Sequence, residues 1–452
     1  MNKYKNKKEE QTKLPMETEP VHILILKMAV PTIISMLITT VYNMTDTFYV
    51  GKIGSEAVAA VGIVYSYMSI IQAFGFLFGH GSGNYIAHKL GQHKGREAEN
   101  MAGTALLLSG IFGVVLGIFS YLFAGKIVRI LGAVNGMTSN AAVYLQALSF
   151  GIPFIIVALM LNNQLRFQGK TLLGMIGIGM GGILNIAMAP LFIFVLNMKV
   201  EGAGIATSLC QLISFLLLFY IARKKSVVHI TIKRLQINAN LIKELLWGGM
   251  PNFTRQAIAS FAMLCLNLSI IRYGEQVIAA FTIVNRWLMM TGAAMIGLGQ
   301  GFQPVCAYNY GAKLYKRVKA GFKFCCTVST VAAILLTGVC YLFSDEIVRI
   351  FTVDSGVISV GKQILRYQCI SVPVLGWVIM SGMLLQNTGR YKQATIVSAS
   401  RQGIVFLPVL GIMVYLGSLK GILLVQPLAD IGTFLISLPM GIRVLKFLNG
   451  MD

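Results

Sequence analysis

Hydrophobic residues in this chain gather in long blocks, and the charged residues lie between them. Five stretches of the first half contain no Asp, Glu, Lys or Arg; they cover residues 57–87, 101–125, 130–165, 171–198 and 202–222. An α-helix needs about 20 apolar residues to cross the hydrocarbon core of a bilayer. Only helices and closed barrels satisfy their backbone groups there, and these stretches are too long for barrel strands. The pattern therefore predicts an all-α integral membrane protein.

The same reading along the whole chain predicts twelve transmembrane helices. We expect them near residues 24–49, 56–82, 101–124, 138–164, 172–196, 202–223, 244–271, 276–302, 322–344, 361–387, 394–416 and 420–446. Among the prolines within these spans, we expect Pro31, Pro153, Pro251, Pro373 and Pro408 to kink the helix. A proline in a transmembrane helix frees backbone groups, which can then line a cavity.

The second half of the chain repeats the first at a spacing of 220 residues. Residues 31–170 align with 251–390 without a gap, and Tyr121-Leu122-Phe123 recurs as Tyr341-Leu342-Phe343. Three glycines also recur, since Gly79, Gly81 and Gly91 align with Gly299, Gly301 and Gly311. Six spans per half give both halves the same orientation, so we expect two six-helix lobes related by an axis along the membrane normal. Such repeats are typical of secondary transporters, with a central cavity between the lobes.

Composition and charge fit this architecture. Hydrophobic residues make up 56% of the chain and charged residues 12%, with a net charge of +22. Most basic residues fall in alternate connections, among them those at 89–96, at Arg166 and Lys170, and at 313–323. Cytoplasmic loops carry such an excess, so we predict a multi-pass plasma membrane protein with both termini cytoplasmic. The basic charge thus indicates membrane topology and not nucleic-acid binding.

These boundaries divide the chain into four parts. We expect a cytoplasmic tail at residues 1–20, an N-lobe at 21–223, a cytoplasmic linker at 224–243 and a C-lobe at 244–447. The linker contains a short amphipathic stretch at 227–237, which we interpret as a solvated connector. The seven cysteines show neither metal-ligand spacing nor a disulfide framework, so they are best explained as small apolar residues.

Several stretches give the chain a family resemblance. The first span ends with Asp46-Thr47 followed by Gly51-Lys52-Ile53-Gly54, and the sixth begins with Gly202-Ala203-Gly204. The eighth ends with Gln303-Pro304 and then Tyr308-Asn309-Tyr310-Gly311. Together with the twelve spans and the repeat, these stretches resemble the multidrug and toxic compound extrusion (MATE) family. The resemblance implies a V-shaped pair of lobes that exports organic cations or drugs in exchange for sodium ions or protons.

Two carboxylates, Asp46 and Asp430, fall well inside predicted spans. Such a group costs about 2.5–3.5 kcal/mol on insertion scales, so it persists with a partner or a function. A low dielectric favours the neutral form of Asp46, which would suit a proton carrier, and a carboxylate is also a hard ligand for a small cation. The alternative is a hydrogen-bonded carboxylate at a helix end near the outer interface. The repeat breaks here, because Asp46 aligns with Leu266.

The resemblance also implies partners for Asp46 on the fifth and sixth spans. Asn185 matches a family asparagine, and Thr207 falls where the family supplies a hydroxyl. The family's second carboxylate is replaced by Ala189. The implied cation-coupling site is therefore Asp46, Asn185 and Thr207, with room for one monovalent cation or one proton. Asn185 could instead join helices by hydrogen bonding.

The second half carries other charges at membrane depth: Arg255, Arg286, Arg401 and Asp430. We interpret them as a structural ion-pair cluster between helices. The alternative is that Asp430 exchanges arginine partners as the lobes move. Methionine and aromatic residues are abundant and suit a cavity for hydrophobic cations, although they are also ordinary packing material. Tyr42 and Met44 are the candidate cavity residues, because they neighbour Asp46.

We therefore expect a secondary antiporter for organic cations or drugs, embedded in the lipid bilayer as a monomer, with a proton or sodium ion as its coupling ion and no other cofactor. A lipid-linked precursor flippase is the alternative, since Arg255, Arg286 and Arg401 could line a cationic cavity. An enzyme is not expected, because the five histidines are scattered and the spans contain no nucleophile constellation. P-loop spacing is also absent from the sequence, which argues against ATP-driven transport by this chain alone.

Overall fold

The computed structural model describes residues 15–133, 137–229 and 237–451, and all regular secondary structure in these ranges is helical. Most of the predicted N-terminal tail and of the amphipathic linker stretch lies outside the described residues. The N-lobe contains α3 (Val21–Gly51), α4 (Ser55–Gly91), α5 (Gly95–Leu122), α6 (Ala124–Ile130), α7 (Met137–Ser149), α8 (Ile152–Phe167), α9 (Thr171–Pro190), η1 (Leu191–Val195) and α10 (Lys199–Lys225). A short helix, α2 (Pro15–Thr18), precedes them.

The C-lobe repeats this order. It contains α11 (Ala239–Ile270), η3 (Ile271–Tyr273), α12 (Glu275–Gly311), α13 (Tyr315–Leu342), α14 (Ser344–Arg349), α15 (Ser355–Cys369), α16 (Val372–Asn387), α17 (Tyr391–Ala399), η4 (Ser400–Ile404), α18 (Phe406–Tyr415) and α19 (Leu419–Asn449). Ten spans within the described ranges are long and apolar enough to cross a membrane, and two bent helix pairs raise the number to twelve. The twelve predicted spans and the two-lobe fold are thereby confirmed.

The two bent pairs correspond to the predicted spans at 138–164 and 361–387. α7 and α8 meet at 54°, and α15 and α16 meet at 50°. Pro153 and Pro373 occupy the first turn of α8 and α16, where a proline's missing N–H needs no helical partner. Each span is therefore two helices with a corner, and the corner recurs at the same place in the repeat.

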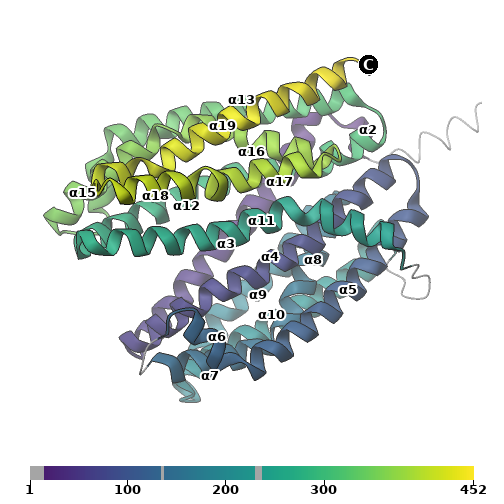
Figure 1. Cartoon of the computed structure of the whole chain (residues 1–452). Coiled ribbons are helices and arrows are strands. Elements are labelled where there is room, and N and C mark those ends of the chain that lie inside the picture. Colours follow the sequence, from purple (N-terminus) through teal and green to yellow (C-terminus); the bar gives the residue numbers. More distant parts are fainter. Residues whose placement is uncertain (1–14, 134–136, 230–236, 452) are drawn as a thin grey trace, which may run out of the picture.

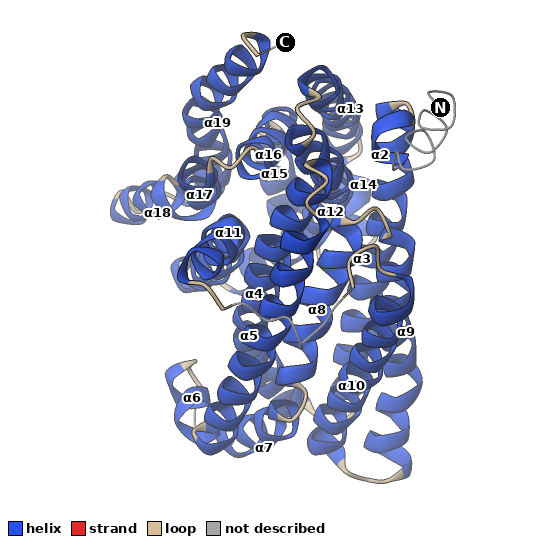
Figure 2. Cartoon of the chain, turned by 90° about the vertical axis from the view of Figure 1, so that its right-hand side faces the viewer, coloured by secondary structure: helices blue, strands red, loops and turns tan. Residues whose placement is uncertain are grey.

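The lobes lie together at one end of the molecule and separate toward the other (Figure 1). The end at which they separate carries α6 and α7 of the N-lobe and α15 and α18 of the C-lobe. Figure 2, which views the molecule from the end at which the lobes meet, shows α2 near α12 and α13. We call this the closed end; it includes the basic connections that follow α4 and α12.

Glycines permit the close contact between lobes at the closed end. A Cβ atom at Gly81 of α4 would overlap the carbonyl of Leu245 on α11, and one at Gly249 would overlap the carbonyl of Leu77. Nearer the helix ends, a Cβ at Gly91 would overlap the carbonyl of Tyr308. These backbones approach so closely because no side chain stands between them.

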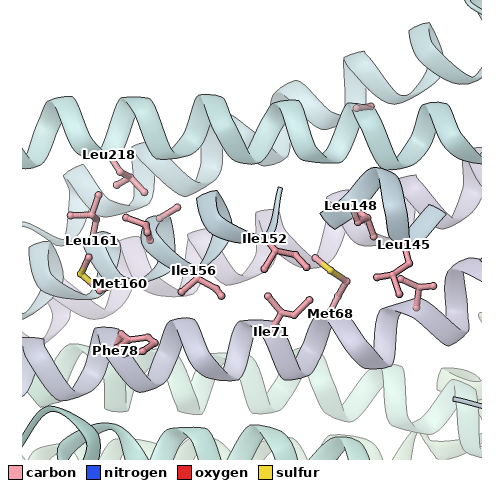
Figure 3. Packing of buried hydrophobic residues seen from close by; sticks show 14 of the residues in the cluster. Met68, Ile71, Phe78, Leu145, Leu148, Ile152, Ile156, Met160, Leu161 and Leu218 are labelled. Carbon is pink, nitrogen blue, oxygen red and sulfur yellow. The ribbon is translucent and has the colours of Figure 1, made fainter. Parts of the chain in front are cut away.

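The N-lobe core lies between α4, α8 and α10, where buried aliphatic residues interlock (Figure 3). Ile71 and Phe78 of α4 face Ile152 and Ile156 of α8, and all four are almost completely buried. In a bilayer such contacts are favoured by dispersion and close packing, because lipid tails are as apolar as leucine. This rigid packing fixes α4 and α8 as the frame for the polar groups described next.

Candidate functional site

Asp46 lies near the end of α3, on the side that packs against α9. A Cβ at Gly182 of α9 would lie 2.9 Å from the ring of Tyr42, so the two helices touch at this level. Asp46 follows Tyr42 by one turn, and Asn185 follows Gly182 by about one turn in the same direction. The glycine in α9 thereby brings Asp46 and Asn185 to the same level of the N-lobe.

Asn185 and Thr207 form a polar contact between α9 and α10. Asn185 is 3% exposed, and its Nδ2 donates to Thr207 Oγ1 at 3.1 Å, which joins α9 to α10. Asp46 lies within electrostatic range of Tyr42 and Cys210, and Cys210 follows Thr207 by about one turn of α10. The carboxylate therefore lies among α3, α9 and α10, on the level of the Asn185–Thr207 bond.

One oxygen of Asp46 is available for a ligand. Its Oδ1 is a buried atom without a hydrogen-bond donor among the described residues. Buried polar atoms are nearly always paired, so an unpaired carboxylate oxygen suits a proton or a small cation. Ala189 is completely buried and adds no second charge. Within the described ranges no group of three His, Cys, Asp or Glu residues could hold a metal ion.

The two candidate cavity residues differ in position. Tyr42 is partly buried and packs its ring against Gly182. Met44 is 52% exposed, on a different side of α3. Leu266, which aligns with Asp46, is 8% exposed and packs in the C-lobe core. The two lobes therefore match in backbone but differ in charge at this level.

In the C-lobe the structure joins two of the four predicted charges. Arg401 Nε donates to Asp430 Oδ1 at 2.8 Å, from the π-helical turn η4 to α19. Gln426 donates to the same oxygen at 2.9 Å, and Ser371 donates to Oδ2 at 2.9 Å. Asp430 is 2% exposed and is fully paired.

The other two arginines lie apart from that ion pair. Arg255 of α11 is half-buried and donates to Asn252 Oδ1 on its own helix at 3.2 Å. Arg286 of α12 is exposed. The predicted cluster is thus an Arg401–Asp430 pair, with Arg255 held separately and Arg286 at the surface.

Sequence reasoning missed a buried cation in the N-lobe. The charge pattern placed Arg166 in a cytoplasmic connection, but it lies on α8 with 3% of its surface exposed. Its Nη2 donates to His80 Nε2 at 2.9 Å and to Asn163 Oδ1 at 2.6 Å. The run Asn162-Asn163-Gln164 within an apolar span was a sign that polar partners continue into this helix.

Polar contacts between the lobes also seal the closed end. Asn84 of α4 donates to the carbonyl of Gln386 on α16 at 3.0 Å, and His88 Nε2 lies 2.6 Å from the carbonyl of Asn387. Within the C-lobe, the Gln386 side chain in turn donates to the carbonyl of Gly248 on α11 at 2.7 Å, which holds α16 in place for these contacts. These bonds make the closed end the site at which the lobes would have to part during a rocking motion.

Comparison with known proteins identifies a relationship over most of the chain. The MatE family model matches residues 31–191 and 251–410, two segments with the spacing of the internal repeat. The chain is 27% identical over 409 residues to "Multidrug export protein MepA" of Staphylococcus aureus (strain NCTC 8325 / PS 47), which covers 90% of each chain. It is 26% identical over 402 residues to the protein of that name in Staphylococcus haemolyticus (strain JCSC1435), covering 88% of each.

Solved structures share the same fold. The chain superposes with a TM-score of 0.90 on a MATE in the straight conformation, at 23% identity, covering 96% of this chain and 98% of that one. It superposes with a TM-score of 0.89 on an outward-facing multidrug resistance MATE family transporter of the MOP superfamily, at 24% identity and with the same coverage.

Proposed function

The chain belongs to the MatE family of membrane transporters, and on that premise we propose that it exports organic cations or drugs in exchange for a proton or sodium ion. The family consists of multi-pass transporters and not of enzymes. The multidrug export relatives support the substrate class, and their bacterial origin supports the plasma membrane as location. The observation that carries the coupling proposal is the unpaired Oδ1 of Asp46 beside the Asn185–Thr207 bond.

The basic connections indicate which end of the molecule faces the cytoplasm. Lys89, Lys94 and Lys313 lie in the connections at the closed end, and cytoplasmic loops are enriched in such residues. We therefore assign the closed end to the cytoplasm, together with both termini. The lobes then separate toward the outside, so this conformation can release a drug and admit an external ion.

The proposed cycle uses Asp46 as the single carrier of the coupling ion. An external proton or sodium ion reaches the free carboxylate oxygen and neutralises it, which weakens the attraction for an organic cation. The lobes then part at the closed end and approach at the other, a motion that carries the ion inward. With Ala189 in place of a second carboxylate, the site has the charge to exchange one monovalent ion per cycle.

Everted membrane vesicles provide the test. Asp46→Asn retains the size of the side chain and removes its charge, so we expect gradient-driven accumulation of a cationic dye to be abolished. Glu201→Gln is the matched control, because Glu201 is an exposed carboxylate at the start of α10, and it should transport like the wild type. Wild-type activity in the Asp46 variant would overturn the proposal. Collapse of the proton and sodium gradients in separate vesicles identifies the coupling ion.

The flippase alternative rests on a cationic cavity formed by three arginines of the C-lobe. Arg401 is neutralised by Asp430, which leaves fewer free positive charges for such a cavity. The described contacts therefore favour the flippase function less than antiport. Transport of a simple organic cation by the purified chain in liposomes, with no lipid-linked substrate present, would decide for the antiporter.

A further inference from the structure

Arg166 is the only lysine or arginine, among those the structure describes, that is almost completely buried. Two glycines of α4 allow α8 to approach closely enough for this. A Cβ at Gly79 would lie 2.8 Å from the Asn163 amide nitrogen, and a Cβ at Gly83 would overlap the Phe167 ring. The close approach places the guanidinium between His80 and Asn163.

Both hydrogen-bonding neighbours are neutral, and the Phe167 ring, whose centroid lies 5.4 Å from the guanidinium carbon, carries no net charge, so none of the three neutralises Arg166. His80 Nδ1 lies 3.2 Å from the carbonyl of Phe76, so Nδ1 is the donor and Nε2 accepts from Arg166. Asn163 contributes an amide oxygen. Only Nη2 of the guanidinium is used, while Nε and Nη1 are buried and have no hydrogen-bond partner in the described chain.

No carboxylate in the described ranges forms an ion pair with Arg166. The charged side chain within electrostatic range of Arg166 is another cation, Arg255 of the C-lobe, which is also within range of His80. Asp430 is a buried carboxylate of the C-lobe, but its oxygens already accept hydrogen bonds from Arg401, Gln426 and Ser371. Two cations from opposite lobes therefore lie within electrostatic range of each other, and no carboxylate in the described ranges is paired with either of them.

We propose that Arg166 binds a small monovalent anion, with Arg255 supplying the second positive charge from across the lobe interface. A buried charge is strongly unfavourable unless it is paired and hydrogen-bonded, and the free N–H groups of a guanidinium are the donors such an anion requires. A halide ion and the carboxylate group of an organic molecule share this chemistry. The site goes beyond the proposed antiport, since it needs neither the exported cation nor the coupling ion.

The position of the site gives the anion a mechanical role. Arg166 belongs to the N-lobe and Arg255 to the C-lobe, and α4 and α11 touch close by through Gly81 and Gly249. An anion between the two cations removes their repulsion and stabilises the closed end. Parting of the lobes would weaken the site, so anion release would accompany the change of conformation.

The internal repeat supplies a suitable test variant. The residue that aligns with Arg166 is Gln386, which occupies the equivalent helix in the C-lobe. Gln386 is 2% exposed, donates to the carbonyl of Gly248, and accepts from Asn252 and Gln303. Arg166→Gln therefore installs, at the same point of the fold, the neutral residue that the other lobe already accommodates.

Equilibrium binding of ³⁶Cl⁻ to the purified full-length chain in detergent tests the proposal, with gluconate holding the ionic strength constant and no organic cation present. We expect saturable binding to the wild type and at least tenfold weaker binding to Arg166→Gln. Arg255→Gln should weaken binding at least threefold. Arg96→Gln removes an exposed arginine and is the matched control, which should bind like the wild type. Gel filtration verifies that each variant is folded. If Arg166→Gln aggregates, the binding measured for Arg255→Gln tests the proposal instead.

A second arm with radiolabelled benzoate distinguishes the two sources of the anion. Saturable chloride binding that depends on Arg166 identifies an inorganic halide. Saturable benzoate binding with the same dependence, in the absence of chloride binding, identifies an organic carboxylate. Failure of the wild type to bind either anion would overturn the proposal, as would equal binding by the wild type and both arginine variants. Either result leaves the Asp46 experiment unaffected, so the two proposals fail separately.

Discussion

At the scale of single residues, the buried charges of the two lobes are held in different ways. Asp430 receives donors from Arg401, Gln426 and Ser371, so its charge is compensated within the C-lobe. Asp46 retains an unpaired oxygen, and Arg166 retains unpaired nitrogens. A satisfied ion pair maintains structure, whereas unpaired groups are available to a ligand.

Asp430→Asn should therefore lower stability and preserve transport. The substitution leaves Arg401 without its counter-charge, and because that arginine is 30% exposed we expect a loss of about 2–3 kcal/mol, below the ~3–5 kcal/mol typical of fully buried pairs. Thermal unfolding in detergent should show a lower Tm, while dye transport in vesicles stays near normal. Loss of transport at temperatures where the variant is still folded would instead indicate that Asp430 exchanges partners during the cycle.

At the scale of helices, the lobes meet through bare backbone. Gly81 and Gly249 each face a carbonyl of the opposite lobe, and the positions leave no room for a Cβ atom. Helix pairs in membranes gain stability from such close approach. A side chain at either position would force the helices apart at the closed end.

Gly81→Val should accordingly disfavour closure of this end. We expect spin labels at positions 94 and 316, on exposed residues that follow α4 and α12, to move apart relative to the same labels in the unsubstituted protein. Gly110→Val is the control, since a Cβ at that position of α5 meets nothing within 4 Å. Unchanged distances in Gly81→Val, with the fold intact, would show that the contact is not needed for closure.

The sequence predicted the elements well and the polar contacts less well, for physical reasons. Spans follow from the thickness of the bilayer, and the corners before Pro153 and Pro373 follow from a missing N–H. The burial of Arg166 depends on Gly79 and Gly83, which let α8 approach α4 closely. Such a contact between two helices cannot be deduced from the spacing of residues along the chain. The sequence likewise could not show which of three arginines pairs with Asp430. Only the packed structure shows that Arg401 reaches it and that Arg286 is exposed.

At the scale of the whole molecule, α2 connects the two lobes at the closed end. Met16 is 4% exposed, and its methyl group lies near Gly169, in the turn between α8 and α9. Tyr308 of α12 donates to Glu17 at 2.7 Å. Arg317 of α13 donates to the carbonyls of Met16 at 3.1 Å and Glu19 at 2.6 Å. The segment before the first span is therefore a strap across the lobe interface.

Arg317→Ala should loosen this strap. Loss of the donor leaves the two backbone carbonyls without their charged partner. A hydrogen bond to a charged group contributes about 1.5–3 kcal/mol to stability. Amide hydrogen exchange in residues 15–20 should accelerate, whereas Lys316→Ala, at an exposed neighbouring lysine, should leave it unchanged. Equal protection in both variants would mean that α2 is held by Met16 and Glu17 alone.

The contacts of Gly91 and Gly311 have a consequence for the origin of the fold. Gly91 meets the backbone of Tyr308, and Gly311 meets that of His88, so each contact is the other displaced by one repeat. Such reciprocity is the mark of an isologous interface, the kind that joins two identical subunits about a two-fold axis. The chain is thus built as a tethered homodimer. Because the two halves are separate stretches of one chain, each can differ from the other, as with aspartate at position 46 and leucine at 266.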